Sequence, residues 1–386
     1  LIESKKIGKG ASGINGGFCS PGWSLGKDCL SRQVGFETAT SFYNISMEGL
    51  RWVRSFKGRN GFESMGIKAG TVALSLLKSE VDVRNDFLKS DLAFQKEYQF
   101  LSKKDLIDYV DSSAYQAGIF SRSGFSFNPL SFLMGLKNDI KLKRPQSVFE
   151  ESTMGYFSES NDFCQIYLTN GYSIRAQKLV IATGGYGGYE SGYLRTRWLP
   201  ITTSILVTSP LSAEVKKIIN PEYAFSDDRR AGNYFRLISN NRLLWGRGIN
   251  AVKSPDREDS KKSAIKDIKK FFPNIGDMHP HGNLDFKFVW SGKMAYSKSM
   301  MPYVGRLTPR TYALTGFGGH GMNTAPAAAI LLAEYLSGLS NRVSIFKKIP
   351  LKWNGGRIGP LAAEITYRLM IAKDSFNQRL LCITRK

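Results

Sequence analysis

Residues 312–321 read Tyr-Ala-Leu-Thr-Gly-Phe-Gly-Gly-His-Gly, and this stretch decides the expected fold. Residues 312–315 have the short, apolar composition of a buried strand, residues 316–321 form a glycine loop, and residues 325–336 are an Ala/Leu-rich helix. A helix that opens from such a loop presents unpaired N–H groups and the positive end of its dipole. The stretch therefore predicts a site for an anionic cofactor, although a tight turn before a packing helix is the commoner explanation of a single glycine loop.

A second glycine-rich loop covers residues 8–17, after Leu-Ile-Glu at residues 1–3. Glu3 stands where a dinucleotide-binding fold places a carboxylate on a ribose hydroxyl, so Glu3 and this loop together favour a nucleotide. The Gly-x-Gly-x-x-Gly turn of that fold would precede Glu3. We therefore expect that the first βα unit has been lost from the amino terminus, which leaves an inactive fragment as one interpretation of the chain.

The remaining patterns predict a cofactor-binding layer. Apolar spacing predicts helices over residues 37–56 and 130–140, and residues 178–185 form an apolar strand that runs into glycines, as parallel strands do at a ligand-binding edge. Residues 147–150 and 164–169 are expected to pair as antiparallel strands, with Asn170 and Gly171 as a turn.

A second, mainly antiparallel domain is predicted from strands at residues 201–208, 234–238 and 242–245 and a helix that ends near Phe272. The expected class is α/β (α+β). Residues 1–60, 125–190 and 295–375 would form the cofactor domain. Residues 61–124 and 191–294 would form the substrate domain.

The 386-residue chain carries 54 Lys and Arg against 32 Asp and Glu, a formal net charge of +22. Such an excess attracts anionic partners, but the basic residues are scattered and are not interleaved with aromatic residues, which argues against nucleic acid. Four cysteines without Cys-x-x-Cys spacing and three histidines indicate no metal site. No apolar run approaches the ~20 residues of a transmembrane helix, so we expect a cytoplasmic protein.

Several segments, in order along nearly the whole chain, resemble the FAD-dependent D-amino-acid oxidase family, especially its glycine oxidase and gamma-glutamylputrescine oxidase branch. These segments are Glu3 with residues 10–17, and residues 127–130, 179–186, 200–211, 233–237, 241–246, 290–292, 301–305 and 316–323. The resemblance implies a glutathione-reductase-like, Rossmann-type FAD-binding domain and a mainly antiparallel β substrate domain.

The resemblance also implies which residues hold the cofactor. Glu3 would bind the adenosine ribose, Met154 would contact the adenine through its backbone, and the other contacts would come from three loops. Those loops contribute Ala11, Ser12, Gly13, Asn15, Gly16 and Gly17; Ala182, Thr183 and Gly184; and Gly318, Gly319, His320, Gly321, Met322 and Asn323. Covalent sarcosine oxidases attach flavin through a cysteine near this chain's residues 297–300, which are Ser, Lys, Ser and Met, so we expect non-covalent FAD.

The implied reaction oxidises a C–N bond of a small amine or amino acid by hydride transfer to flavin N5, and the imine product then hydrolyses. Gly319, His320 and Gly321 would act in catalysis, because helix-end amides stabilise charge that develops on the flavin ring. Tyr186, Tyr234, Arg236 and Trp290 would contact the substrate, although Tyr234 and Arg236 are equally well explained as sheet residues with structural partners. The electron acceptor would be oxygen or another compound.

A different class of function stays open at this point. A basic protein with a flavin-binding fold could bind or modify nucleic acid, and salt-dependent RNA binding would support that alternative.

Overall fold

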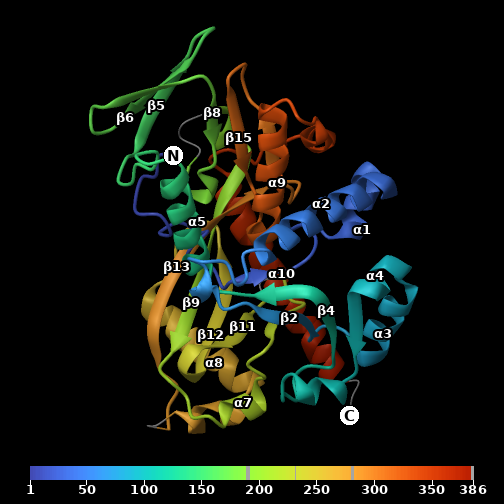
Figure 1. Ribbon diagram of the computed structural model, residues 1–386. Coiled ribbons are helices and arrows are strands. Elements are labelled where there is room, and N and C mark those ends of the chain that lie inside the picture. The colour runs from blue at the N-terminus through green and yellow to red at the C-terminus, as the bar shows by residue number, and fades with distance from the viewer. Residues whose placement is uncertain (188–191, 231, 280–281, 384–386) are drawn as a thin grey trace. The chain divides into compact units, whose positions relative to one another are not determined.

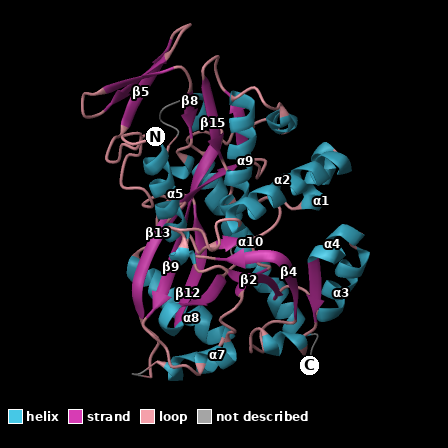
Figure 2. Ribbon diagram, viewed as in Figure 1, coloured by secondary structure: helices cyan, strands magenta, loops and turns pink. Residues whose placement is uncertain are grey.

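The computed structural model describes residues 1–187, 192–230, 232–279 and 282–383, and within them the chain forms two compact units. The first unit comprises Leu1–Gly66, Asn128–Ile201 and Lys293–Gly359, and the second comprises Ile67–Phe127, Thr202–Gly292 and Pro360–Lys386. Helices and strands occur in both units (Figures 1 and 2). The predicted α/β class is therefore confirmed, whereas the division of labour between a cofactor unit and a substrate unit stays a prediction.

The first unit contains two small sheets and the helices packed around them. Its strands are β1 (Phe18–Cys19), β5 (Met154–Glu159), β6 (Cys164–Leu168), β7 (Ser173–Ala176), β8 (Leu179–Ile181), β14 (Tyr303–Arg306) and β15 (Thr311–Thr315). Its α-helices are α1 (Lys27–Val34), α2 (Phe36–Arg54), α5 (Pro129–Lys143), α6 (Gly192–Arg195) and α9 (Gly321–Leu336), and its short 3-10 helices are η1 (Glu63–Met65), η3 (Gly184–Tyr186) and η6 (Arg342–Lys348).

One of these sheets has the order β14-β15-β8, and β15 pairs in parallel with β8. The two apolar strands expected from residues 178–185 and 312–315 are thus confirmed. Because they are parallel neighbours, the loops after them leave from the same edge of the sheet, where α/β folds bind ligands.

Helices α2 and α9 approach each other closely in the first unit. An added Cβ at Gly49 of α2 would lie 1.9 Å from the backbone oxygen of Asn323 and 2.8 Å from Cβ of Ala327 in α9. Phe42, Ile45 and Leu331 line the apolar cluster of these helices. The position of α9, and of the loop before it, therefore depends on a glycine at residue 49.

The other small sheet corrects one prediction from the sequence. Strand β6 pairs with β5 on one side and β7 on the other, not with residues 147–150. Phe149 instead forms a parallel bridge with Ile2, and its carbonyl accepts a hydrogen bond of 2.9 Å from the N–H of Glu3. The turn predicted at Asn170 and Gly171 is confirmed, since it connects β6 to β7 with Gly171 at a φ of 89°.

The second unit is built on one large mixed sheet, whose strands, like all others, are magenta in Figure 2. Within this unit the strand order is β4-β2-β10-β11-β12-β9-β13, and β3 also pairs with β4. These strands are β2 (Lys68–Ser75), β3 (Tyr98–Leu101), β4 (Ala117–Ser126), β9 (Trp198–Thr208), β10 (Ala224–Asp227), β11 (Tyr234–Ile238), β12 (Arg242–Asn250) and β13 (Phe286–Ser297).

The helices of the second unit are α3 (Glu80–Lys89), α4 (Leu92–Glu97), α7 (Val215–Ile218), α8 (Arg257–Phe271) and most of α10 (Gly359–Ile383). Its 3-10 helices are η2 (Asp105–Asp108), η4 (Ser239–Asn241) and η5 (Pro273–Met278). None of the described helices, in either unit, is both long and apolar enough to cross a membrane.

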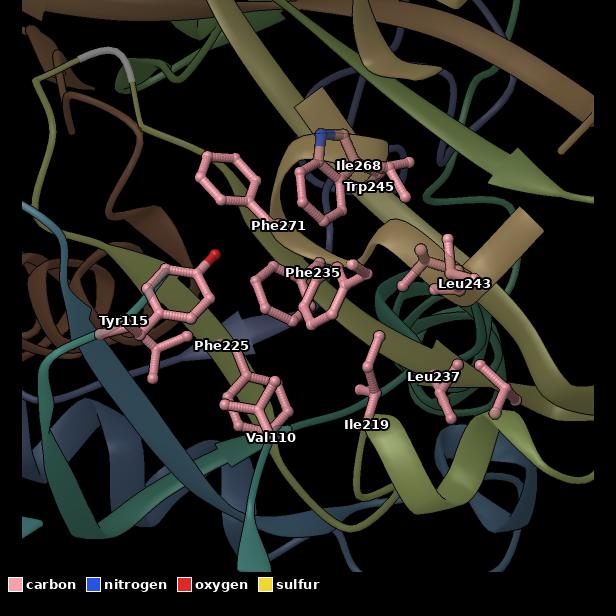
Figure 3. Packing of buried hydrophobic residues seen from close by; sticks show 14 of the residues in the cluster. Val110, Tyr115, Ile219, Phe225, Phe235, Leu237, Leu243, Trp245, Ile268 and Phe271 are labelled. Atoms are coloured by element: carbon pink, nitrogen blue, oxygen red, sulfur yellow. The ribbon is translucent and has the colours of Figure 1, made fainter. Parts of the chain in front are cut away.

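An aromatic stack forms the core of the second unit (Figure 3). Phe235 of β11 stacks on Trp245 of β12 at 4.9 Å between ring centroids and on Phe225 of β10 at 5.2 Å. Tyr115 and Phe271 extend the stack, with centroids 5.7 Å apart. These rings cover one face of the sheet, so the alternate residues of β11 point to the opposite face.

The carboxyl-terminal boundary of the predicted cofactor domain differs from the structure. Residues 295–375 were expected in one domain, but most of α10 clusters with the second unit. Two hydrogen bonds explain this placement, because Glu364 accepts from the N–H of Ala251 at 2.8 Å and Asp374 accepts from the N–H of Arg230 at 3.1 Å. Acidic side chains thus fix α10 to the strands and loops of the second unit.

Candidate functional site: the glycine turn before helix α9

The turn between β15 and α9 adopts a backbone conformation that requires glycine. Gly316, Gly318 and Gly319 have φ values of 85°, 58° and 78°, which other residues rarely adopt. An added Cβ at Gly319 would lie 2.8 Å from Sδ of Met294 and 3.0 Å from the hydroxyl of Tyr296. Gly319 is nonetheless exposed, so its backbone is open to a bound group.

The amino terminus of α9 is suited to an anion. No side chain caps the helix and no acidic residue lies in its first turn. The first N–H groups of a helix have no partner within it, and the helix dipole adds about half a positive charge there. The loops at residues 182–184 and 316–321 follow the parallel strands β8 and β15, so both leave the same edge of the sheet. A flavin dinucleotide, which is an anion with a polar ring edge, fits this arrangement.

A segment that the sequence analysis did not single out holds the turn in place. The hydroxyl of Ser24 donates to the Gly318 carbonyl at 2.9 Å, and the Asn323 amide donates to the Gly22 carbonyl at 3.2 Å. Nε2 of His320 lies 3.1 Å from the carbonyl oxygen of Ser20. The only signal in the sequence was a short run of turn-forming residues around a tryptophan, Ser-Pro-Gly-Trp-Ser, soon after the first glycine loop.

The side chain of His320 is anchored rather than free. A carbonyl oxygen only accepts, so Nε2 carries the proton in its contact with Ser20. Burial lowers the pKa of His320 from the ordinary value of 6.5, and the imidazole is therefore neutral at pH 7. The imidazole thus helps to hold the turn in place.

The first glycine loop reaches the same turn through Asn15. The amide of Asn15 donates to the carbonyl oxygens of Ala11 and Ser12, at 3.0 and 2.9 Å, and its oxygen accepts from the Gly17 N–H at 2.8 Å. The same amide lies 3.1 Å from Sδ of Met322. The structure therefore brings together the two glycine loops, which the sequence separates by about 300 residues.

Close packing within the first loop also explains Gly13. An added Cβ there would lie 2.3 Å from the Gly8 carbonyl oxygen, so no side chain fits without opening the loop. Gly16 and Gly17 are buried, and Gly17 has a φ of 75°.

The other residues predicted to bind the cofactor lie around this edge of the first unit. Ala182 and Thr183 are exposed directly after β8, and Gly184 has a φ of 56°. Met154 is half-buried at the start of β5. The carboxylate of Glu3 accepts from the N–H of Lys5 at 3.0 Å, a local bond that still leaves the side chain partly exposed.

Of the four residues predicted to contact the substrate, Tyr186 lies in the first unit. Its hydroxyl accepts a hydrogen bond of 3.1 Å from the N–H of Lys293, and its side chain lies 4.0 Å from the position of a Cβ on Gly10. Tyr186 therefore borders the first glycine loop.

Tyr234, Arg236 and Trp290 lie in the second unit. Tyr234 and Arg236 alternate with the core residues Phe235 and Leu237, so they share the face of the sheet opposite the aromatic stack. Tyr234 and Trp290 also pack on one small apolar cluster, which is made of Ile205, Val207 and Leu244. We call this surface, defined by Tyr234, Arg236 and Trp290 with that cluster, the second face.

Arg236 is the cation of the second face. It donates to the Phe127 carbonyl at 2.7 Å and to the Ser126 hydroxyl at 3.3 Å. Burial lowers the pKa of Arg236 to about 10, so it remains charged at pH 7. Burial also raises the pKa of Tyr234 to about 12, so the tyrosine remains neutral. The bidentate pairing of Arg236 with a carboxylate stays a prediction.

The ring of Tyr234 lies against Gly246, its cross-strand partner in β12. An added Cβ at Gly246 would lie 1.9 Å from Cζ of Tyr234. We expect Gly246→Ala to lower the free energy of unfolding by about 1–3 kcal/mol, as overpacking does. In a Tyr234→Ala background, Gly246→Ala should lower the free energy of unfolding much less. Urea unfolding of the unsubstituted chain, the two single variants and the double variant measures the difference. Equal costs in both backgrounds would show that the ring is not positioned by Gly246.

The buried imidazole of His320 predicts a pH dependence of stability. Because its pKa is lowered in the folded chain, the unfolded chain binds the proton more readily, and stability is lost as the pH falls below 6.5. His320→Gln can keep the bond to the Ser20 carbonyl but cannot titrate. We expect its unfolding free energy to fall less between pH 7.5 and pH 5 than that of the unsubstituted chain. Parallel urea curves at several pH values measure this, and identical pH slopes would contradict it.

The described residues offer no cluster of side chains that could bind a metal ion. Among the described residues, no three His, Cys, Asp or Glu side chains are grouped to hold an ion. Two of the three histidines, His279 and His281, stand close together in the sequence. The structure describes His279, but His281 lies outside the described residues. Cys19 is buried, and burial raises the pKa of its thiol, which disfavours the reactive thiolate.

Comparisons with known proteins find relatives along most of the chain. Probable oxidoreductase OrdL of Haemophilus influenzae is 26% identical over 95% of this chain and 84% of its own length. Gamma-glutamylputrescine oxidoreductase of Escherichia coli is 25% identical over 92% of this chain and 82% of its own length.

Solved structures show the same fold. Glycine oxidase from Geobacillus kaustophilus superposes with a TM-score of 0.70 at 14% identity, covering 88% of each chain. L-proline dehydrogenase from P. horikoshii gives 0.68 at 16% identity, covering 89% of this chain and 88% of its own. The predicted fold, that of FAD-dependent oxidoreductases, is thereby confirmed. Residues 1–335 match the family described as FAD dependent oxidoreductase, and the chain therefore belongs to this family, DAO.

Proposed function

We propose that this chain oxidises a C–N bond of a small amine or amino acid, using non-covalently bound FAD, and that the imine product then hydrolyses. The observation that carries the proposal is the glycine turn before α9, which the first glycine loop joins through Asn15 and Met322. The family match supports the oxidoreductase chemistry. The names of the relatives, which refer to gamma-glutamylputrescine, glycine and proline, support the class of substrate.

The residues of the first unit would hold the cofactor. The backbones of Gly318, Gly319 and Gly321 would face the polar edge of the flavin ring, and residues 11–17 would line the dinucleotide. Glu3, Met154 and residues 182–184 would complete the contacts. When bound, FAD supplies the two-electron oxidation, and the protein supplies orientation and electrostatic stabilisation.

Non-covalent binding is supported by the structure around residue 297. Ser297 donates from its hydroxyl to the Met301 carbonyl at 2.6 Å and lies 3.0 Å from the Ser299 hydroxyl. Ser297 and Ser299 are both buried, and residues 297–300 include no cysteine to attach a flavin.

The second face would recognise the substrate. It offers apolar surface from Tyr234 and Trp290 and the charge of Arg236, which remains protonated at pH 7. A guanidinium suits a carboxylate, so an amino acid or a carboxylate-bearing amine is the favoured ligand.

The visible spectrum of the purified chain, after addition of FAD, tests this proposal. A bound flavin should bleach when gamma-glutamylputrescine, glycine or proline is added without oxygen. Oxygen consumption, compared with reduction of an artificial acceptor, then identifies the electron acceptor. A stably bound flavin that no amine or amino acid reduces would contradict the proposed reaction.

A further inference from the structure

The outward face of helix α10 carries an apolar stripe. Leu361, Ile365, Leu369 and Phe376 are 54%, 51%, 67% and 62% exposed. Their spacing of four, four and seven residues, with Ala372 between the last two, places them on one side of an α-helix. From Leu361 to Phe376 this outer stripe extends about 22 Å, because each helical residue rises 1.5 Å.

The exposed charged residues described in α10 are basic. Arg368 and Lys373 are exposed and flank the outer stripe, and Nε of Arg368 also pairs with Oε1 of Glu364 at 3.2 Å, one helical turn earlier. Both acids described in the helix point inward, since Glu364 accepts from the Ala251 N–H and Asp374 accepts from the Arg230 N–H. The helix therefore presents apolar side chains bordered by cations, and its acids are used to attach it to the second unit.

We propose that the outer stripe of α10 binds an anionic lipid surface, with the helix lying flat in the interface. Apolar side chains of such a helix enter the boundary between headgroups and acyl chains, while flanking Lys and Arg reach the phosphates. The formal net charge of +22 adds long-range attraction to the same surface. This interaction goes beyond the proposed oxidation and does not depend on it.

Charge favours a lipid surface over a second copy of the chain as the occupant. A second copy would bring Arg368 and Lys373 against the same cations and would set one charge of +22 against another. An anionic bilayer complements both the local cations and the net charge. Dimerisation through the stripe is consequently an outcome that would overturn the inference.

The test is flotation of the full chain with vesicles of phosphatidylcholine, alone or with about one-third phosphatidylglycerol. We expect binding to the anionic vesicles only. Leu369→Gln with Phe376→Gln should lower the partition coefficient about 10-fold or more, because two apolar side chains no longer enter the interface. Arg368→Gln with Lys373→Gln should lower it about 25-fold, since each cation near an anionic surface contributes about fivefold.

Matched variants elsewhere in the second unit separate the stripe from general effects. Leu88→Gln with Leu92→Gln replaces two exposed leucines of α3 and α4 and should leave binding unchanged. Lys262→Gln with Lys266→Gln removes the same charge from exposed positions of α8 and should lower binding less than the α10 pair. Circular dichroism confirms that each variant is folded.

Three results would overturn the inference. The first is no preference of the folded chain for anionic vesicles. The second is an equal loss of binding from the α8 and α10 charge variants, which would indicate general electrostatic attraction. The third is a dimer in size-exclusion chromatography that Leu369→Gln with Phe376→Gln converts to a monomer.

Discussion

Replacing Gly319 by valine is expected to lower the rate of flavin reduction by about 100-fold or more, the effect of losing a preorganised donor where charge develops. Gly319 has a φ of 78°, a conformation that a β-branched residue adopts only with strain. Its new side chain would also meet Met294 at 2.8 Å and Tyr296 at 3.0 Å. The turn must then move, and the N–H groups at the start of α9 move with it.

Gly338 provides the matched control. It follows the end of the same helix with a φ of 72°, but nothing lies within 4 Å of an added Cβ. Gly338→Val should therefore cost stability through backbone strain alone and leave flavin reduction unchanged in the folded protein. Stopped-flow absorbance at equal FAD occupancy measures both variants. Equal reduction rates in the Gly319→Val variant and the unsubstituted chain would remove this turn from the mechanism.

The parts of the fold that the sequence predicted are those with a local signal. The strand, glycine loop and helix at β15 and α9 were recognisable because apolar runs end directly in glycines, and the structure confirms both elements. Helix α5 was recognisable from Asn128 and Pro129, and the Asn128 side chain indeed accepts from the N–H of Ser131.

The failures arose where pairing partners are distant in sequence. Residues 147–150 have a strand-like composition, but the chain start at Ile2 competes for Phe149, and β6 pairs with β5 and β7 instead. Nothing local distinguishes these alternatives, because a strand's partner is set by the packing of its two faces. The attachment of α10 to Ala251 and Arg230 was hidden for the same reason.

The candidate site also combines residues with a local signal in the sequence and residues without one. Glycines that need a positive φ, such as Gly318 and Gly319, are visible in the sequence as a cluster. The groups that hold them, the hydroxyl of Ser24 and the backbone carbonyl of Ser20, are far away in the chain and belong to ordinary residue types. Gly246 was also missed, since a lone glycine in a strand does not reveal the ring of Tyr234 that lies against it.

The charged pair of Asp227 and Arg229 was equally invisible, although its loss should be the largest single effect on stability. Its two residues stand in the run Ser-Asp-Asp-Arg-Arg, which looks like an ordinary solvated turn. In the structure the Asp227 side chain is fully buried and its Oδ2 lies 2.6 Å from Nη2 of Arg229. Arg229 in turn lies over the ring of Phe271, 5.1 Å from its centroid, next to the aromatic stack.

Asp227→Asn is expected to lower the free energy of unfolding by about 3–5 kcal/mol, because it leaves a largely buried guanidinium without its counter-charge. The carboxylate also accepts from Nε of Arg229 at 3.0 Å and from the N–H of Asn233 at 3.0 Å, bonds that an amide cannot all replace. Asp86→Asn is the matched control, since Asp86 pairs with Lys78 at 2.6 Å but both side chains are more than half exposed. Exposed pairs contribute about 0–1 kcal/mol, so urea unfolding should show little change for that variant. If the two substitutions cost the same, burial of the Asp227 pair is not what stabilises the second unit.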